Sequence, residues 1–119
     1  MNLGDFGAIV QKALKTLPKE FREILKKKQV GVVIRAKMPK EVKNKYPGQV
    51  VFGMFIGVTF GHFTLMQTEP TRIELYKESF EMHFKDETRM KHEIAKTVLH
   101  EVGHYFGFTE QRLHDLHLG

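Results

Sequence analysis

Five residues near the end of the chain have the types and spacing of a metal centre. Residues 100–104 read His-Glu-Val-Gly-His, the pattern H-E-x-x-H. Histidines at positions i and i+4 of a helix project to a common point, where each can offer a ring nitrogen to Zn²⁺ at about 2.0–2.1 Å. Glu101 falls on the neighbouring face, from which its carboxylate can reach a water on the metal. The pattern predicts that His100 and His104 are metal ligands and that Glu101 is a general base.

A third ligand is expected after a turn. The pattern continues to H-E-x-x-H-x-x-G-x-x-E, with Gly107 and Glu110 at its last two defined positions. In a continuous helix Glu110 would lie about 9 Å beyond His104 along the axis, on another face. Gly107 can take the left-handed conformation that ends a helix and turns the chain back, which would return Glu110 to the metal. Three protein ligands with one open position are typical of catalytic zinc sites.

Two nearby residues are alternatives for the third ligand, namely His114 and Asp115. Glu110 also suits a purely structural position, because Thr109 and Glu110 are typical of the start of a short helix, here over residues 111–116. Two imidazoles and a carboxylate favour zinc among the available divalent ions, so Zn²⁺ is the expected cofactor.

The motif must lie on a helix that buries its other side. Between about residues 86 and 106, apolar residues recur every three or four positions. They cover one arc of about 140° on a helical wheel: Ile94, Ala95, Val98, Leu99, Val102, Tyr105 and Phe106. His100 and His104 fall outside this arc, about 40° apart. Tyr105 lies within it, so core packing is favoured over a role in stabilising an oxyanion.

The preceding residues predict the elements that support this helix. Two N-terminal helical segments are expected over residues 5–17 and 18–28, and strands over 30–34, 50–63 and 72–76, with a loop at 37–48. The strand over 72–76 alternates polar and apolar residues, so one exposed face is expected. The glycines at 53, 57 and 61 indicate either a bent core strand or a strand that lines the substrate.

This order predicts an α/β (α+β) domain with a small mixed sheet of three or four strands. The sheet is expected to pack against the N-terminal helices and the C-terminal H-E-x-x-H helix. A chain of 119 residues has the size of one core, so a single domain over residues 1–119 is expected.

The composition of the chain excludes several kinds of site and bears on its partners and location. The chain has no cysteine, which excludes disulfide scaffolds, thiolate metal sites and thiol nucleophiles. Its formal charge of +5 permits an anionic partner without requiring one. The longest apolar run, residues 50–61, is shorter than the roughly 20 residues of a membrane span. The first residues also lack the order of a signal peptide, so a soluble, cytoplasmic protein with no membrane partner is expected.

The sequence resembles the small bacterial zincin-like metallopeptidases, which have a minimal version of the zincin fold. The resemblance runs over nearly the whole chain, through Phe6 and residues 17–21, 52–58, 70–76, 97–107 and 112–114. Only the stretch around the H-E-x-x-H motif is chemically specific. In that family the residue six positions after the second histidine is usually Asp, whereas this chain has Glu110.

The favoured function is a zinc-dependent peptidase acting on a peptide or protein. His100, His104 and Glu110 would hold the ion, and Glu101 would take a proton from the attacking water and deliver it to the leaving amine. A peptide could add to the strand around residues 53–57 through main-chain hydrogen bonds.

Two other functions stay open. The first is a metal-dependent RNA-processing enzyme with histidines in the pattern H-x3-H-x5-H, which the basic charge favours slightly. Two residues of this chain do not fit that pattern: the pattern has no equivalent of Glu101, and it has His where this chain has Glu110. Nucleic acid is therefore a less favoured partner than a peptide. The second is a binding module that keeps the metal site without turnover.

Overall fold

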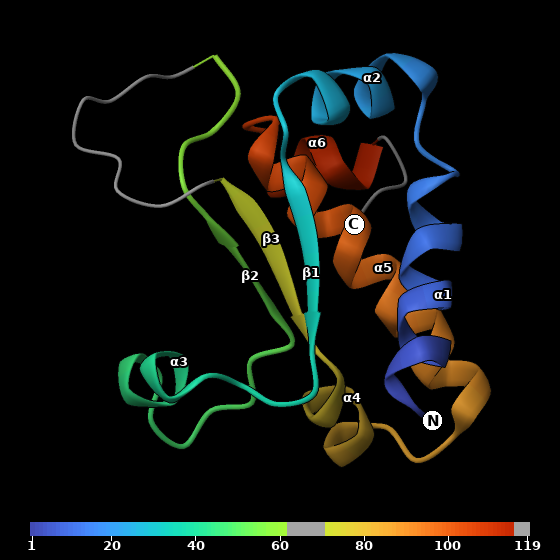
Figure 1. Ribbon diagram of the computed structural model, residues 1–119, viewed down its shortest axis with the longest axis vertical. Helices are drawn as coiled ribbons and strands as arrows, with labels where there is room; N and C mark the ends of the chain where they lie inside the picture. The colour runs from blue at the N-terminus through green and yellow to red at the C-terminus, as the bar shows by residue number, and fades with distance from the viewer. Residues whose placement is uncertain (62–70, 116–119) are drawn as a thin grey trace.

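A three-stranded sheet with helices around it forms the framework of the computed structural model, which describes residues 1–61 and 71–115 (Figure 1). In chain order the elements of these residues are α1 (Leu3–Leu14), α2 (Lys19–Lys27), β1 (Gly31–Arg35), α3 (Lys40–Lys45), β2 (Gly53–Ile56), β3 (Arg72–Tyr76), α4 (Lys77–His83), α5 (Glu87–Tyr105) and α6 (Glu110–Asp115). The fold is therefore α+β, as predicted. No helix in this part of the chain combines the length and apolar character that crossing a bilayer requires.

The sheet is mixed and has the strand order β1-β3-β2. β1 runs parallel to β3, with Val32 opposite Ile73, whereas β2 runs antiparallel to β3, with Phe55 opposite Ile73. The last strand in sequence is thus the middle strand in space. β1 and β2 are the outer strands of the described sheet, and each leaves one edge without a neighbouring strand among the described residues.

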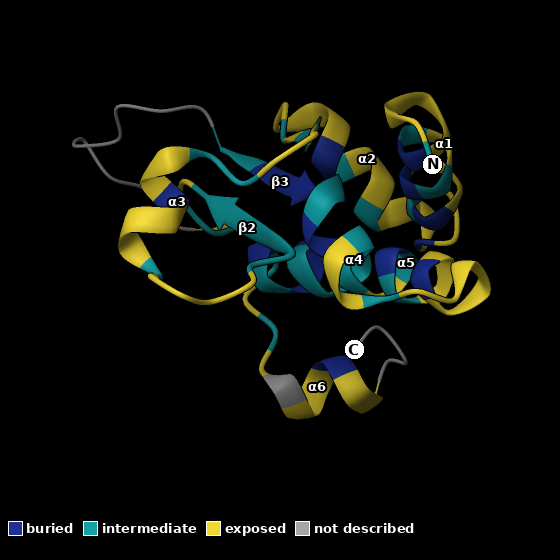
Figure 2. Ribbon diagram, turned by 90° about the horizontal axis from the view of Figure 1, so that it is seen from below, coloured by how far each residue is buried: buried dark blue, intermediate teal, exposed yellow. Residues whose placement is uncertain are grey.

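One face of the sheet is covered by α1 and α5, which lie side by side (Figure 1). The core between them is apolar and fully enclosed; it includes Phe6 and Val10 of α1, Ile73 and Leu75 of β3, and Ile94, Val98 and Val102 of α5. Figure 2 shows these helices buried on one side and exposed on the other. The apolar arc predicted for the motif helix is confirmed.

The predicted helix over residues 5–17 is shifted towards the N-terminus. α1 begins at Leu3 because the side chain of Asn2 accepts a hydrogen bond of 2.7 Å from the backbone N–H of Asp5, which caps the first turn. The helix ends at Leu14, yet Leu17 remains buried in the turn that follows. The apolar spacing therefore identified the buried residues better than the helix end.

The prediction of a loop over residues 37–48 is wrong in part, because this stretch contains the helix α3. Pro39 precedes the first helical residue, where its fixed φ suits the start of a helix, and the side chain of Val42 is buried. The short helix α4 was not predicted either. Both are brief helices rich in charged residues, with too few turns to show a clear apolar period.

The strand predicted over residues 50–63 is much shorter in the structure. β2 spans four residues and ends before Gly57, whose φ of 116° bends the chain away from the sheet. A β-carbon at Gly57 would lie 2.7 Å from the Cα of Thr71, so this bend also depends on the absence of a side chain. Residues 62 and 63 lie outside the described residues.

The exposed face expected for residues 72–76 is a wrong prediction. Glu74 is 2% exposed and Tyr76 is fully buried. The Glu74 carboxylate accepts hydrogen bonds from Arg35, Arg72 and the Tyr76 hydroxyl, so the buried charge is paired. Alternation of polar and apolar residues indicates an exposed face only where water reaches the polar side chains. Because β3 is the middle strand, side chains of β1 and β2 lie on both sides of its polar side chains and exclude water from them.

Candidate metal centre

The two histidines of the motif lie together on one side of α5. This helix starts with Asp86 as its cap, whose carboxylate accepts a hydrogen bond of 3.0 Å from the N–H of Thr88. The rings of His100 and His104 have centroids 4.4 Å apart and planes inclined by 53°. Both side chains are half-buried, while Val98 and Val102 on the other side of the helix are buried in the core. α5 therefore presents two imidazoles from adjacent turns at one place on the surface.

The turn after the motif has the form predicted for Gly107. Its φ is 78°, in the left-handed region that favours glycine. The N–H of Gly107 donates to the carbonyl of His104 at 2.9 Å, and the N–H of Phe108 donates to the carbonyl of Gly103 at 3.0 Å. This pair of bonds is the Schellman arrangement, which satisfies the last helical carbonyls and reverses the chain.

α6 then packs back against the motif. Thr109 caps it, since its hydroxyl accepts a hydrogen bond of 3.1 Å from the N–H of Arg112, as the predicted start of a short last helix requires. Leu113 is fully buried against Gly103, and a β-carbon at Gly103 would collide with the Leu113 side chain. The small residue inside the H-E-x-x-H motif is thus the place where α6 docks onto α5.

The predicted third ligands all belong to α6. Glu110 is the first residue of this helix, one turn after Gly107, and its side chain lies outside the described part of the structure. Asp115 accepts a hydrogen bond from the side chain of Gln111 at 2.9 Å. Among the described residues, no three His, Asp or Glu side chains are grouped to hold a metal ion, so neither His114 nor Asp115 completes a site with the two histidines. Leu116, the predicted end of this helix, is not among the described residues.

The donors that the structure brings together fit a divalent metal. Neutral imidazoles are common ligands of zinc, and a helical pair one turn apart is a frequent way of supplying two of them. His100 and His104 are thus placed where they could serve as two ligands of a divalent metal ion.

A pocket of about 270 Å³ adjoins the motif between α5 and β2. Its walls come from α5, from the start of β2 and from the residue before it: Phe52, Gly53, Glu93, Lys96, Thr97, His100 and Glu101. Glu101 is half-buried in it, beside the first histidine. The sequence reasoning did not identify Glu93, Lys96 or Thr97 as site residues. These residues lie seven, four and three positions before His100, on the same face of the helix as that histidine. This spacing could have identified them from the sequence.

Aromatic contacts fix the end of α5 to its neighbours. The N–H of Phe60, in the segment after β2, donates to the carbonyl of Tyr105 at 2.8 Å. The Tyr105 ring lies 5.9 Å from that of Phe55 in β2, and the ring of Phe21 in α2 lies 4.7 Å from that of Phe106. Tyr105 is 3% exposed and burial raises the pKa of its phenol, so it packs in the core as predicted.

Two comparisons with known proteins bear on this site. No match was found among curated proteins. A family model described as zincin-like metallopeptidase matches residues 28–119, a range that contains all three strands and the whole H-E-x-x-H motif. The match covers most of the chain and leaves out only α1 and α2 among the described elements. The chain belongs to the family of zincin-like metallopeptidases.

Proposed function

We propose that this chain is a zinc-dependent peptidase in which His100, His104 and Glu110 hold the ion and Glu101 is the catalytic base. The observation that carries the proposal is the pairing of His100 with His104 on one side of α5, together with a pocket that His100 and the half-buried Glu101 line side by side. Membership of a metallopeptidase family supports a metal-dependent, peptidase-like activity.

Each residue has a distinct task in this proposal. Zinc held by two imidazoles and a carboxylate would polarise a carbonyl group and lower the pKa of a water ligand towards about 7. The Glu101 carboxylate accepts the proton of the attacking water and then donates it to the departing amine nitrogen. Its half-buried position limits the number of solvent waters that compete for that proton.

The substrate is proposed to be an extended peptide lying along β2. β2 pairs with β3 along one edge, and no described strand occupies the other. Gly53 of β2 lines the same pocket as His100 and Glu101, so a peptide paired with this edge would pass beside both side chains. The main chain of β2 would then supply affinity, and the pocket would receive one side chain.

The test is Glu101→Gln, with Glu93→Gln as its matched control. Both glutamates lie on α5 and line the pocket, but only Glu101 is given a proton to carry. Glutamine has nearly the same size and cannot accept a proton at neutral pH. At saturating concentrations of an unfolded protein, the rate of hydrolysis should fall by about 10²-fold or more in Glu101→Gln and change little in Glu93→Gln. Zinc content, measured by elemental analysis, should equal that of the parent in both variants.

Three outcomes would contradict the proposal. Loss of zinc from Glu101→Gln would make this residue a ligand, and unchanged turnover would remove it from the mechanism. A zinc-loaded parent that cleaves structured RNA but none of a broad panel of unfolded proteins would replace the peptidase with the RNA-processing alternative.

A further inference from the structure

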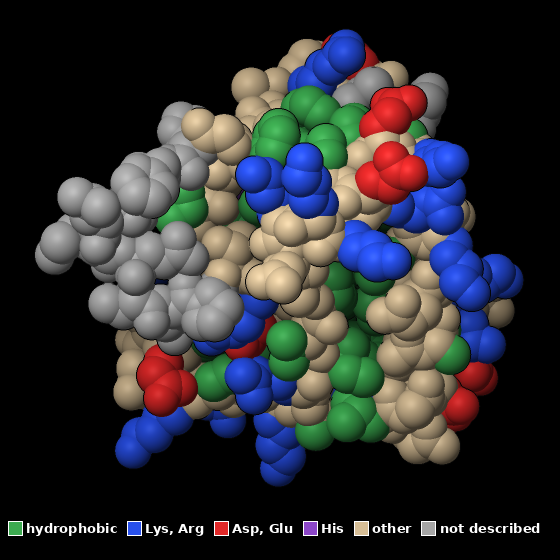
Figure 3. All heavy atoms as spheres, turned by 45° about the horizontal axis from the view of Figure 1, so that its top comes forward, with side chains coloured by type: hydrophobic (Ala, Val, Ile, Leu, Met, Phe, Trp, Pro, Cys, Tyr) green, Lys and Arg blue, Asp and Glu red, His purple; other side chains and the backbone are tan. Residues whose placement is uncertain are grey.

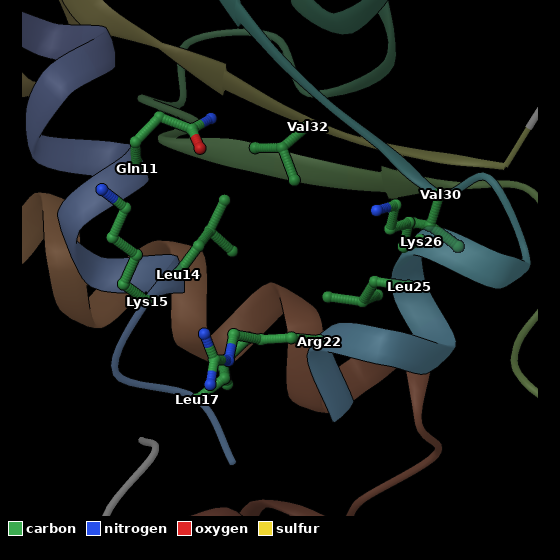
Figure 4. A pocket seen from close by; sticks show the side chains of 9 residues that line it. All are labelled: Gln11, Leu14, Lys15, Leu17, Arg22, Leu25, Lys26, Val30 and Val32. Carbon is green, nitrogen blue, oxygen red and sulfur yellow. The ribbon is translucent and has the colours of Figure 1, made fainter. Parts of the chain in front are cut away.

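A second cavity lies between α1, α2 and β1, on a different part of the molecule from the motif. Its volume is about 310 Å³, and none of its lining residues lines the pocket beside His100 (Figure 4). The cavity is therefore separate from the proposed peptidase site.

The uncharged residues that line this cavity are apolar except for Gln11. Leu17 and Leu25 are buried at its base, and Leu14, Val30 and Val32 are half-buried around it. These residues come from α1, α2, β1 and the connections that follow α1 and α2. Figure 4 shows Leu14, Leu25 and Val32 directed towards the hollow. A hydrocarbon group placed here would remove both its own surface and theirs from water, which is favourable.

The rim of the same cavity is cationic. Lys15, directly after α1, and Arg22 and Lys26 of α2 line it, and no Asp or Glu does. All three residues are exposed, and none forms an ion pair with any described residue. Figure 3 shows Lys and Arg side chains beside exposed apolar ones on this side of the molecule. Three cations thus surround an apolar hollow without a neutralising partner in the part of the chain that the structure describes.

We propose that this cavity binds a monomeric aliphatic carboxylate, with its tail on the apolar surface and its carboxylate among Lys15, Arg22 and Lys26. A neutral hydrocarbon would leave the cations without a counter-charge, and a small inorganic anion would leave the apolar surface in water. Binding pockets for small ligands start at about 300 Å³, so the volume suits a single chain of moderate length.

The first experiment titrates the full chain with hexanoate, octanoate and decanoate, each below its micelle concentration. Affinity, measured by calorimetry, should rise by about fourfold per added methylene until the cavity is filled. Acetate and the uncharged decanol serve as controls for the head group and the tail, and each should bind at least about tenfold more weakly than decanoate.

The second experiment locates the ligand and tests the cations. In ¹H–¹⁵N spectra, decanoate should shift the amide signals of residues 11–17 and 30–32 rather than those of 96–101. The triple variant Lys15→Gln, Arg22→Gln, Lys26→Gln should lose about tenfold or more in affinity. The triple variant Lys12→Gln, Lys27→Gln, Lys28→Gln removes the same charge from exposed lysines that lie in α1 or at the end of α2 and do not line the cavity. It should bind like the parent.

The proposal is overturned by any of four results: no saturable binding of decanoate, equal binding of decanol, equal losses in the two triple variants, or shifts centred on residues 96–101. The last would place the carboxylate at the motif instead. Because all substituted residues are exposed, circular dichroism should show that both triple variants are folded like the parent.

Discussion

At the scale of single residues, Glu74 has an environment that makes its charge part of the fold. Its Oε2 accepts hydrogen bonds from Arg35 at 3.0 Å and from Arg72 at 2.7 Å, and its Oε1 accepts one from the Tyr76 hydroxyl at 3.1 Å. Burial alone raises the pKa of Glu74, but the hydrogen bonds from Arg35, Arg72 and Tyr76 outweigh it and hold the pKa below its ordinary value. Arg35 belongs to β1, so this carboxylate joins two strands.

A pH dependence of stability follows from the lowered pKa. The stabilisation is fully present above the pKa of an unfolded glutamate, about 4.3, and is lost as the pH falls through the lower folded value. Glu74→Gln should reduce the free energy of unfolding by about 1–3 kcal/mol at pH 7 and should flatten its fall in acid. Urea unfolding between pH 7 and pH 3 measures both effects.

The matched control for Glu74 is Glu78→Gln. Among the described residues, the Glu78 carboxylate forms one long ion pair, of 3.9 Å with Lys37, and both side chains are exposed to solvent. Glu78→Gln should change the free energy of unfolding by less than about 0.5 kcal/mol. Equal effects of the two variants would show that pairing of the buried carboxylate contributes nothing special.

The proposed metal ligands give a second prediction at this scale. His100→Ala or His104→Ala should abolish stoichiometric zinc binding, because the two ligands that remain hold the ion poorly, and Glu110→Ala should weaken it about tenfold or more. His114→Ala should bind like the parent, since His114 forms no three-residue metal group among the described residues. Calorimetric zinc titration measures these affinities. Weak binding by His114→Ala together with parent-like binding by Glu110→Ala would show that His114, and not Glu110, is the third ligand.

At the scale of elements, the contact between α5 and α6 positions the end of the proposed site. Gly103→Ala should drive α6 away, because the new methyl group would collide with Leu113. The expected cost is about 1–3 kcal/mol of unfolding free energy, together with weaker zinc binding if Glu110 is a ligand. Thermal unfolding and zinc titration of the same samples separate the two effects.

Leu113→Ala provides the control for Gly103→Ala. It removes the side chain with which the added methyl group collides, so Gly103→Ala should cost much less in the Leu113→Ala background than in the parent. A full cost in both backgrounds would locate the strain elsewhere in α5.

The sequence predicted this end of the fold well because its signals are local. The H-E-x-x-H spacing, the apolar arc and the left-handed Gly107 each depend on residues within a few turns of one another. The same reasoning failed for Glu74, whose burial depends on β1 and β2 lying on either side of β3. It also left open the cationic cavity, whose walls come from three elements that local spacing cannot bring together.

At the scale of the whole molecule, α1 belongs to the same core as the motif helix although it precedes residue 28, where the family match begins. Phe6 is fully buried, and its ring lies 5.8 Å from that of Phe80 in α4. We therefore expect one cooperative unit that includes the residues before the match.

Phe6→Ala tests this unit. It should lower the free energy of unfolding by about 3–5 kcal/mol, as the removal of a fully enclosed aromatic side chain does. Leu3→Ala, on the same helix but 40% exposed, should cost less than about 0.5 kcal/mol. A single unfolding transition seen both by circular dichroism and by release of zinc is expected, and two separate transitions would mean that α1 is not part of the unit that holds the site.

The strand order β1-β3-β2 also governs when the molecule can fold during its synthesis. In the described sheet β1 and β2 pair with β3 and not with each other. During synthesis neither strand can therefore be paired until residues 72–76 have emerged from the ribosome. Only then can the sheet close, and α5 and α6 leave the exit tunnel after it. The H-E-x-x-H motif and Glu110 thus emerge only after the sheet can close, so the proposed peptidase site would be the last part of the described fold to assemble, after the chain can no longer be attacked as an unpaired sheet.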